Sequence, residues 1–199
     1  MSFILGLTGP TGAGKGVFSA CAKELGFNVI DCDLVARRAV EKGMPALLAL
    51  TKLFGQDILL KSGELDRKKL AAVAFSDNYK TELLNKTVLP YIKELVVKEI
   101  KGDKVLLDAP TLFESGVNSV CDKTVAVLAS ENLRKGRIIS RDNIDESAAD
   151  IRLSAGKPDE FYYNNADEVI INNGDMKSFE KKVKIYLENI IGGTENERV

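Results

Sequence analysis

A glycine-rich stretch near the start of the chain constrains the fold more than any other feature. The apolar run Phe3–Leu7 is followed by GPTGAGKG at residues 9–16, and a helical pattern comes next. Successive backbone N–H groups of such a turn can point into one concavity, where the helix N-terminus adds partial positive charge. Gly9, Gly14 and Lys15 fit the phosphate-loop spacing G-x4-G-K. The sequence therefore predicts a loop that binds nucleotide phosphates rather than a plain glycine turn.

One position of this motif differs from the usual pattern. A Ser or Thr normally follows the lysine, and its hydroxyl is a ligand of Mg²⁺. Here Gly16 follows Lys15, and the next residue, Val17, has no hydroxyl either. Because Mg²⁺ usually keeps several water ligands, a water can replace the missing hydroxyl at reduced affinity.

Five short apolar runs predict the strands of a parallel sheet. They are nearly continuous rather than alternating, as expected of strands covered by helices on both faces. Helical stretches of about ten residues or more separate them, which is typical of repeated βαβ units. We therefore predict an α/β fold, a doubly wound five-stranded parallel sheet of the P-loop NTPase type with a helical insertion. The five runs are Phe3–Leu7, Phe27–Ile30, Lys104–Leu107, Thr124–Leu128 and Glu168–Ile171.

Two segments do not fit a simple crossover between strands. The interval from Val35 to Ile100 is too long for one helix and carries apolar residues at helical spacing, which predicts a helical insertion at the edge of the sheet. The stretch from Leu133 to Arg152 is rich in Arg and Asp, and we expect a mobile excursion there. The predicted division is a nucleotide-binding core (1–34, 102–132 and 156–199), a helical region (35–101) and an excursion (133–155).

The composition excludes several kinds of chemistry. The chain has no histidine, which excludes Ser-His-Asp and Cys-His catalysis and His-bearing zinc sites. Acid–base chemistry must therefore use carboxylates, Lys, Tyr or Cys. The 28 Lys and Arg against 29 Asp and Glu argue against a nucleic-acid partner, which would favour a basic excess.

Cysteine use and the lack of targeting segments indicate a cytoplasmic protein. Cys21, Cys32 and Cys121 are scattered and form no C-x-x-C pair, as expected of free thiols in a reducing compartment. We find no signal-peptide pattern and no apolar run of the roughly 18 residues that would span a membrane, so no membrane association is expected. The sequence does not indicate an oligomeric state.

Carboxylates follow two of the predicted strands. Asp31 and Asp33 come after the second strand, and Asp108 ends the third, at the edge where ligands bind in open α/β sheets. Asp108 occupies the usual place of a carboxylate that holds Mg²⁺ through water. Any single Asp at a strand end can instead cap a helix, so the capping alternative stays open for each.

Two arginines in the excursion have helical spacing. Arg137 and Arg141 are four residues apart, so on a helix they share one face. They can be a solvated charge pair, or a pair that closes over phosphates, because guanidinium groups match phosphate oxygens.

Taken together, these motifs resemble the dephospho-coenzyme A kinase family. The resemblance covers most of the chain in the family's order, and the ensemble is more specific than any one motif. It includes the spacing of Arg137 and Arg141 with Arg152. The matching segments are GLTGPTGAGKG (6–16), LGFNVIDCDLVAR (25–37), LFGQDIL (53–59), GELDRKKLAAVAF (63–75), LLDAPTLFESG (106–116) and ADEVIINNG (166–174).

The resemblance implies an activity and a set of site residues. It implies ATP-dependent phosphorylation of the ribose 3′-hydroxyl of dephospho-CoA with Mg²⁺, a helical region for the acceptor at 35–101 and an arginine-bearing lid at 133–155. Asp33 falls on the proposed general base, with Lys15 and Arg141 as the other catalytic residues. The acceptor-binding residues implied are Asp33, Arg37, Arg67 and Asp108, with Asp108 also near the metal through water. The nucleotide-binding residues implied are Gly9, Gly12, Ala13, Gly14, Lys15, Gly16, Val17, Arg137 and Arg141.

Departures from the family pattern leave alternatives open. Gly16 and Val17 replace hydroxyl residues, Leu89 replaces the histidine of a His-Pro pair, and Tyr162 stands where a Lys is expected. A degenerate nucleotide-binding paralogue with weak or no kinase activity therefore remains an alternative, as does another small-molecule P-loop kinase. A GTPase is disfavoured because Asn85-Lys86 is not followed by the Asp that reads guanine.

Overall fold

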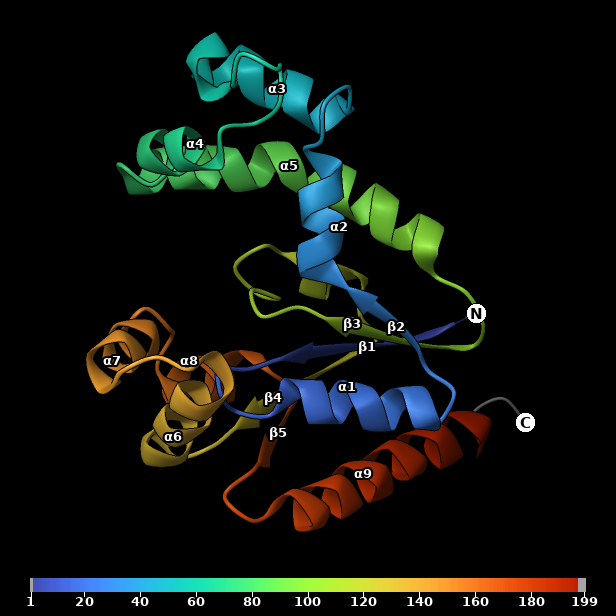
Figure 1. The fold of residues 1–199 in the computed structure, drawn as a ribbon. Coiled ribbons are helices and arrows are strands. Elements are labelled where there is room, and N and C mark those ends of the chain that lie inside the picture. Colours follow the sequence, from blue (N-terminus) through green and yellow to red (C-terminus); the bar gives the residue numbers. More distant parts are fainter. Residues whose placement is uncertain (1, 197–199) are drawn as a thin grey trace.

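The computed structural model describes residues 2–196, and the side chains of 193–196 are left out of the description. These residues form a parallel sheet with the strand order β2-β3-β1-β4-β5 and helices on both faces (Figure 1). The strands are β1 (Phe3–Thr8), β2 (Asn28–Asp31), β3 (Lys104–Asp108), β4 (Lys123–Leu128) and β5 (Glu168–Ile171). The helices are α1 (Lys15–Glu24), α2 (Cys32–Ala39), α3 (Pro45–Phe54), α4 (Arg67–Ala74), α5 (Asn78–Glu99), α6 (Glu131–Asp142), α7 (Glu146–Ser154), α8 (Asp159–Asn165) and α9 (Met176–Asn196), with 3₁₀ turns at Gln56–Ile58 and Val117–Val120.

The sheet is buried on both faces, which explains its nearly continuous apolar strands. Side chains alternate along each strand, so Leu106 packs toward α1 and α9 while Val105 and Leu107 pack toward α2 and α5. All three are fully buried. The predicted fold class is confirmed, and each predicted strand is present to within one residue at its ends.

The second strand begins one residue later than predicted. Phe27 precedes β2, and its backbone N–H donates to the carbonyl of Ala22 in α1 at 3.0 Å. The backbone of Phe27 therefore closes the end of α1, while its side chain still enters the core.

Helices α2 to α5 form the insertion between β2 and β3. The lower part of the insertion, α2 and the C-terminal half of α5, packs on the sheet, whereas α3 and α4 stand away from it (Figure 1). They share a second apolar cluster that includes Leu50, Ile58 and Leu70. The predicted boundary between residues 34 and 35 falls inside α2, and residues 197–199 of the predicted core lie outside the described residues.

The Arg- and Asp-rich excursion forms two helices, α6 and α7. Lys135 of α6 pairs with Glu146 at 3.3 Å and Asp150 at 2.8 Å of α7. Asn143 makes the turn between the helices with a φ of 50°. Charge pairs and a tight turn thus join two helices in a segment that has few large apolar residues. Within residues 2–196, no helix combines the length and the apolar character that crossing a membrane requires.

Candidate functional site: a phosphate-loop cleft

The phosphate loop joins β1 to α1 and depends on glycine at several positions. Gly9, Gly12 and Gly14 have φ angles of 139°, 78° and 116°, which L side chains rarely adopt. A Cβ on Gly9 would lie 2.2 Å from the carbonyl oxygen of Val127 in β4. The loop therefore lies so close to the sheet that an alanine in place of Gly9 would displace the loop.

Lys15, the first residue of α1, folds back across the loop. Its Nζ donates to the carbonyl oxygens of Gly9 at 2.7 Å and Pro10 at 3.3 Å. Burial lowers the pKa of Lys15, and the carboxylates of Asp108 and Asp33 partly oppose this shift. The ammonium group thus lies in the loop, close to two of the predicted carboxylates.

A cleft of about 760 Å³ opens in front of the loop. It gathers residues from the first, second and third strand ends, from α6 and α7, from the segment 155–157, and from the middle of α8. Arg37 and Arg67 are outside its wall. The residues of the lining with polar or charged side chains are Thr11, Lys15, Asp31, Asp33, Asp108, Thr111, Glu114, Arg137, Arg141, Arg152, Lys157 and Tyr162.

The three predicted carboxylates have different local roles. Asp31 caps α2, because its Oδ1 accepts a hydrogen bond from the backbone N–H of Leu34 at 3.0 Å. Asp33 lies in the first turn of α2 with an exposed side chain on the cleft. Asp108 accepts a hydrogen bond from the hydroxyl of Ser19 at 2.7 Å. The capping alternative thus describes Asp31, while Asp33 and Asp108 face the loop lysine.

Both cleft-facing carboxylates hold their protons more tightly than usual. Burial raises the pKa of Asp33, Asp31 raises it further, and Arg37 lowers it. Burial also raises the pKa of Asp108, against the hydrogen bond from Ser19. A carboxylate of raised basicity beside a phosphate loop is suited to accept a proton from an attacking hydroxyl.

The two predicted arginines of the excursion differ in their contacts. Arg137 donates to the carbonyl oxygens of Gly12 at 3.2 Å and Asn172 at 3.1 Å, so it fastens α6 to the phosphate loop and to the end of β5. Arg141 is exposed and donates twice to Asp142, at 2.7 and 2.9 Å. Arg141 is therefore held by a neighbouring side chain at the surface, whereas Arg137 is held by backbone carbonyl oxygens of the phosphate loop and of the β5 end.

Arg37 and Arg67 lie together beside the cleft rather than in its wall. An Nη2 of Arg67 donates to the carbonyl oxygen of Arg37 at 3.3 Å. Arg67 lines a separate, mostly apolar cavity of about 200 Å³ between α2, α4 and α5. Ala36 and Val40 of α2 also line this cavity, so it begins about one turn beyond Asp33.

Sequence reasoning assigned no role to three residues that the fold brings to the loop or the cleft. Ser19 reaches Asp108 because it lies one helical turn after Lys15, a spacing that is visible in the sequence. Asn172 is buried, and its amide donates to the carbonyl oxygen of Ala13 at 2.7 Å. Glu114 lines the cleft from the turn after β3. The contacts of Asn172 and Glu114 cross between distant segments, so no local pattern reveals them.

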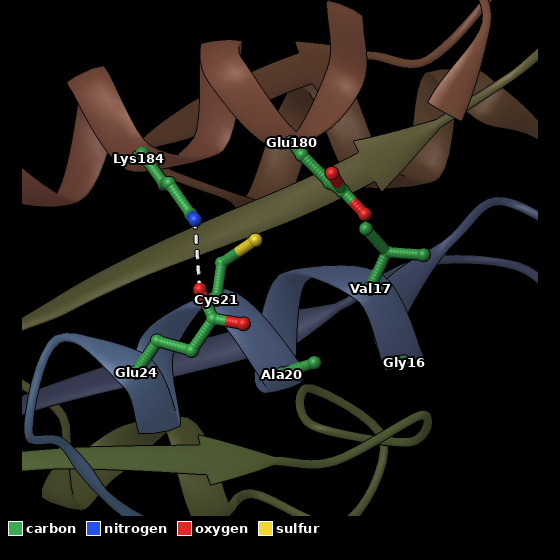
Figure 2. Close-up of a pocket in the computed structure, with 7 residues that line it drawn as sticks. All are labelled: Gly16, Val17, Ala20, Cys21, Glu24, Glu180 and Lys184. Carbon is green, nitrogen blue, oxygen red and sulfur yellow. Dashed lines mark ion pairs between the residues drawn. The ribbon is translucent and has the colours of Figure 1, made fainter. Parts of the chain in front are cut away.

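Gly16 lies where the cleft meets a second cavity of about 230 Å³ between α1 and α9. Figure 2 shows its lining, with the ion pair between Lys184 and Glu24 (2.7 Å) and the thiol of Cys21 between the helices. An added Cβ on Gly16 has no atom within 4 Å, and its φ is not positive. A side chain at this position is therefore sterically free.

Nearly the full length of the chain is similar to known proteins. A family model described as dephospho-CoA kinase matches residues 3–178. The dephospho-CoA kinase of Enterococcus faecalis is 36% identical over 197 residues, which cover 96% of this chain and 99% of that protein. The crystal structure of TT1252 from Thermus thermophilus has a TM-score of 0.75 at 29% identity, covering 94% of this chain and 97% of that one. The dephospho-CoA kinase from Campylobacter jejuni has the same fold, with a TM-score of 0.67 at 24% identity and coverage of 98% and 100%. The phosphate-loop cleft and this match over nearly the full length show that the chain belongs to the dephospho-CoA kinase family.

Proposed function

We propose that this kinase transfers the γ-phosphoryl group of ATP to the ribose 3′-hydroxyl of dephospho-CoA, giving CoA and ADP. The observation that carries the proposal is the position of Asp33 on the wall of the cleft that also holds Lys15 and the phosphate loop. The Asp33 carboxylate and the half-buried Lys15 ammonium group thus line the same space. Such a pair is suited to in-line transfer between a hydroxyl and a phosphoryl group.

Asp33 is the proposed general base. The 3′-hydroxyl oxygen forms a bond to the γ-phosphorus, the bond from that phosphorus to the β–γ bridging oxygen breaks, and the hydroxyl proton moves to the Asp33 carboxylate. The raised pKa of Asp33 favours this transfer, because a more basic carboxylate accepts the proton more readily.

Cations and backbone donors of the cleft are proposed to stabilise the negative charge on the phosphoryl group during its transfer. Lys15 can exchange its carbonyl partners for phosphate oxygens, and Arg141 can leave Asp142 for the same purpose. Arg137 is proposed to act through the loop, because it holds Gly12 and Ala13 by their carbonyl oxygens at 3.2 and 3.4 Å.

The donor set of the cleft fits a magnesium ion bound mainly through the nucleotide. No three Asp, Glu, Cys or His side chains within residues 2–196 are grouped as a metal site. Mg²⁺ commonly binds through one or two carboxylates, waters and substrate phosphates. We propose Asp108 as the carboxylate that holds it through water, and Ser19 orients that carboxylate. When bound, the ion neutralises charge on the phosphates.

The acceptor is proposed to extend from Asp33 along α2. Arg37 lies one turn further on the same helix, and Arg67 contacts its backbone. Their two guanidinium groups are suited to the acceptor's diphosphate. The cytoplasm is the proposed compartment, since Cys21, Cys32 and Cys121 are free thiols.

A coupled ADP-release assay with ATP and dephospho-CoA tests the proposed function. We expect turnover that requires both substrates and Mg²⁺. Tight ATP binding by calorimetry without turnover would favour the degenerate paralogue, which the loss of the loop hydroxyl at Gly16 allows. Turnover with a different small hydroxyl acceptor alone would favour another P-loop kinase.

Gly16→Ser should restore a hydroxyl ligand without a steric cost, because nothing lies within 4 Å of the new Cβ. If the hydroxyl contributes the ~1 kcal/mol of a typical polar contact, half-maximal turnover should require about fivefold less magnesium. A magnesium titration of the initial rate measures this, with Gly16→Ala as the matched control. Identical titrations for the serine and alanine variants would contradict the prediction.

Asp31→Asn should move the acidic limb of the pH profile of kcat/KM to lower pH. The charge of Asp31 raises the pKa of Asp33, so its removal lowers that pKa and keeps the base ionised in more acidic solution. Asparagine also caps helices, so α2 should remain stable. A limb that stays in place, or moves to higher pH, would show that Asp33 is not the titrating base.

A further inference from the structure

Glu114 lies at the wall of the cleft, and one oxygen of its carboxylate has no hydrogen-bond partner among the described residues. It follows β3 in the turn before the 3₁₀ segment, and its side chain is half-buried. Its Oε2 is fully covered and has no hydrogen-bond partner among residues 2–196. A covered carboxylate oxygen without a donor is costly, so a donor that reached this carboxylate from the cleft would offset that cost.

The cations of the cleft have other partners. Lys15 and Arg137 bind backbone carbonyl oxygens, and Arg141 and Arg152 both pair with Asp142. Lys157 lies over the ring of Phe161, 5.4 Å from its centre. Among the described residues, these five cations therefore have partners other than the Glu114 carboxylate.

The position of Glu114 associates it with the acceptor. Asp31 and Asp108 are opposite each other at the ends of the paired strands β2 and β3, so Asp33 and Glu114 follow neighbouring strand ends. The backbone carbonyl of Glu114 accepts a hydrogen bond from Asn85 of α5 at 3.3 Å. Asn85 also lines the cavity that contains Arg67. Glu114 thus joins the cleft to the helical insertion.

The chemistry of the site restricts what Glu114 can bind. A carboxylate repels phosphate oxygens, so its partner must be a hydrogen-bond donor without negative charge. Tyr162 forms the adjoining wall, where burial and the charge of Glu114 raise the pKa of its hydroxyl to about 12. The terminal carboxylate torsion of a Glu is broad, so either oxygen can turn toward the ligand.

We propose that Glu114 is a specificity residue that accepts a hydrogen bond from a neutral donor on the acceptor's nucleoside. This inference rests on the proposed function, which supplies two such donors, the ribose 2′-hydroxyl and the adenine amino group. A carboxylate placed here favours an acceptor with that donor over one that lacks it, because the analogue would leave the carboxylate unpaired.

Calorimetric binding and steady-state kinetics of Glu114→Ala test the proposal. We expect at least tenfold weaker binding and a higher KM for dephospho-CoA, with the KM for ATP unchanged. Glu114→Gln keeps an acceptor oxygen and should lose less. Glu188→Ala, an exposed carboxylate on α9, is the matched control, and thermal melting checks that each variant folds.

Substrate analogues identify the donor. One analogue, 2′-deoxy-dephospho-CoA, lacks the ribose 2′-hydroxyl, and the other, dephospho-CoA deaminated at C6 of adenine, lacks the amino group. With the analogue that lacks the donor, the original chain and Glu114→Ala should bind with the same low affinity. Equal loss from the variant with both analogues, or a parallel rise in the KM for ATP, would overturn the proposal. Glu114-dependent binding of dephospho-CoA without turnover would support it while refuting the proposed reaction.

Discussion

Asp33→Asn should lower kcat by about 10²–10⁴-fold, the usual range for removal of a general base. The amide keeps the shape of the side chain but cannot accept the proton from the acceptor's 3′-hydroxyl. Because Asp33 is exposed in the first turn of α2, the fold should lose only the small helix-dipole contribution of its charge, about 0.3–1 kcal/mol. Rapid-mixing or steady-state ADP release measures the effect.

Asp31→Asn is the matched control for this result. It removes a carboxylate two residues away whose oxygen caps α2, and its kcat near neutral pH should stay close to that of the original chain. ATP and dephospho-CoA should still bind the Asp33 variant. A similar loss in both variants, or a nearly unchanged kcat in Asp33→Asn, would move the base function away from Asp33.

Gly9→Ala should abolish measurable ATP binding. The new Cβ would overlap the carbonyl oxygen of Val127 at 2.2 Å, and the φ of 139° is strained for alanine. The strained backbone alone costs about 1–3 kcal/mol, and the overlap forces the loop away from β4. Loop N–H groups that have moved can no longer converge on phosphates. Calorimetry with ATP and thermal melting measure the two effects.

Alanine substitutions at two other glycines distinguish backbone strain from steric overlap as the cause of the lost ATP binding. Gly102→Ala introduces strain at a φ of 77° with no atom within 4 Å, so it should lower stability and leave ATP binding intact. Gly16→Ala adds a Cβ in open space in the first turn of α1 and should bind ATP almost normally. Unimpaired ATP binding by Gly9→Ala would mean that the loop tolerates displacement from the sheet.

Local patterns predicted the sheet and the phosphate loop well. Apolar runs of strand length mark buried strands wherever both faces are covered, so all five strands were predicted to within a residue. The ends were less predictable, because Phe27 is apolar like a strand residue while its N–H binds the end of α1. Helices α6 and α7 of the excursion give little apolar signal, because charge pairs across a turn, such as those of Lys135, join them. The mobility expected between Leu133 and Arg152 stays a prediction.

Roles that depend on long-range contacts could not be predicted in this way. The spacing of Arg137 and Arg141 indicated a shared helical face, and both line the cleft. Their contacts differ because the carbonyl of Gly12 lies within reach of Arg137, whereas Asp142 is the neighbour of Arg141. The part that each arginine takes in phosphate binding stays a prediction, as do the roles of Arg37 and Arg67.

The sequence by itself determined the glycine loop, the order of strands and helices, and the absence of histidine chemistry, because these depend on residue type and short spacing. Only the tertiary structure decided which carboxylate caps a helix and which faces the lysine, and only it brought Glu114 and Asp33 into the lining of one cleft. The physical reason is the parallel sheet, which brings the ends of β1, β2 and β3 to one edge although about 100 residues separate the first from the last.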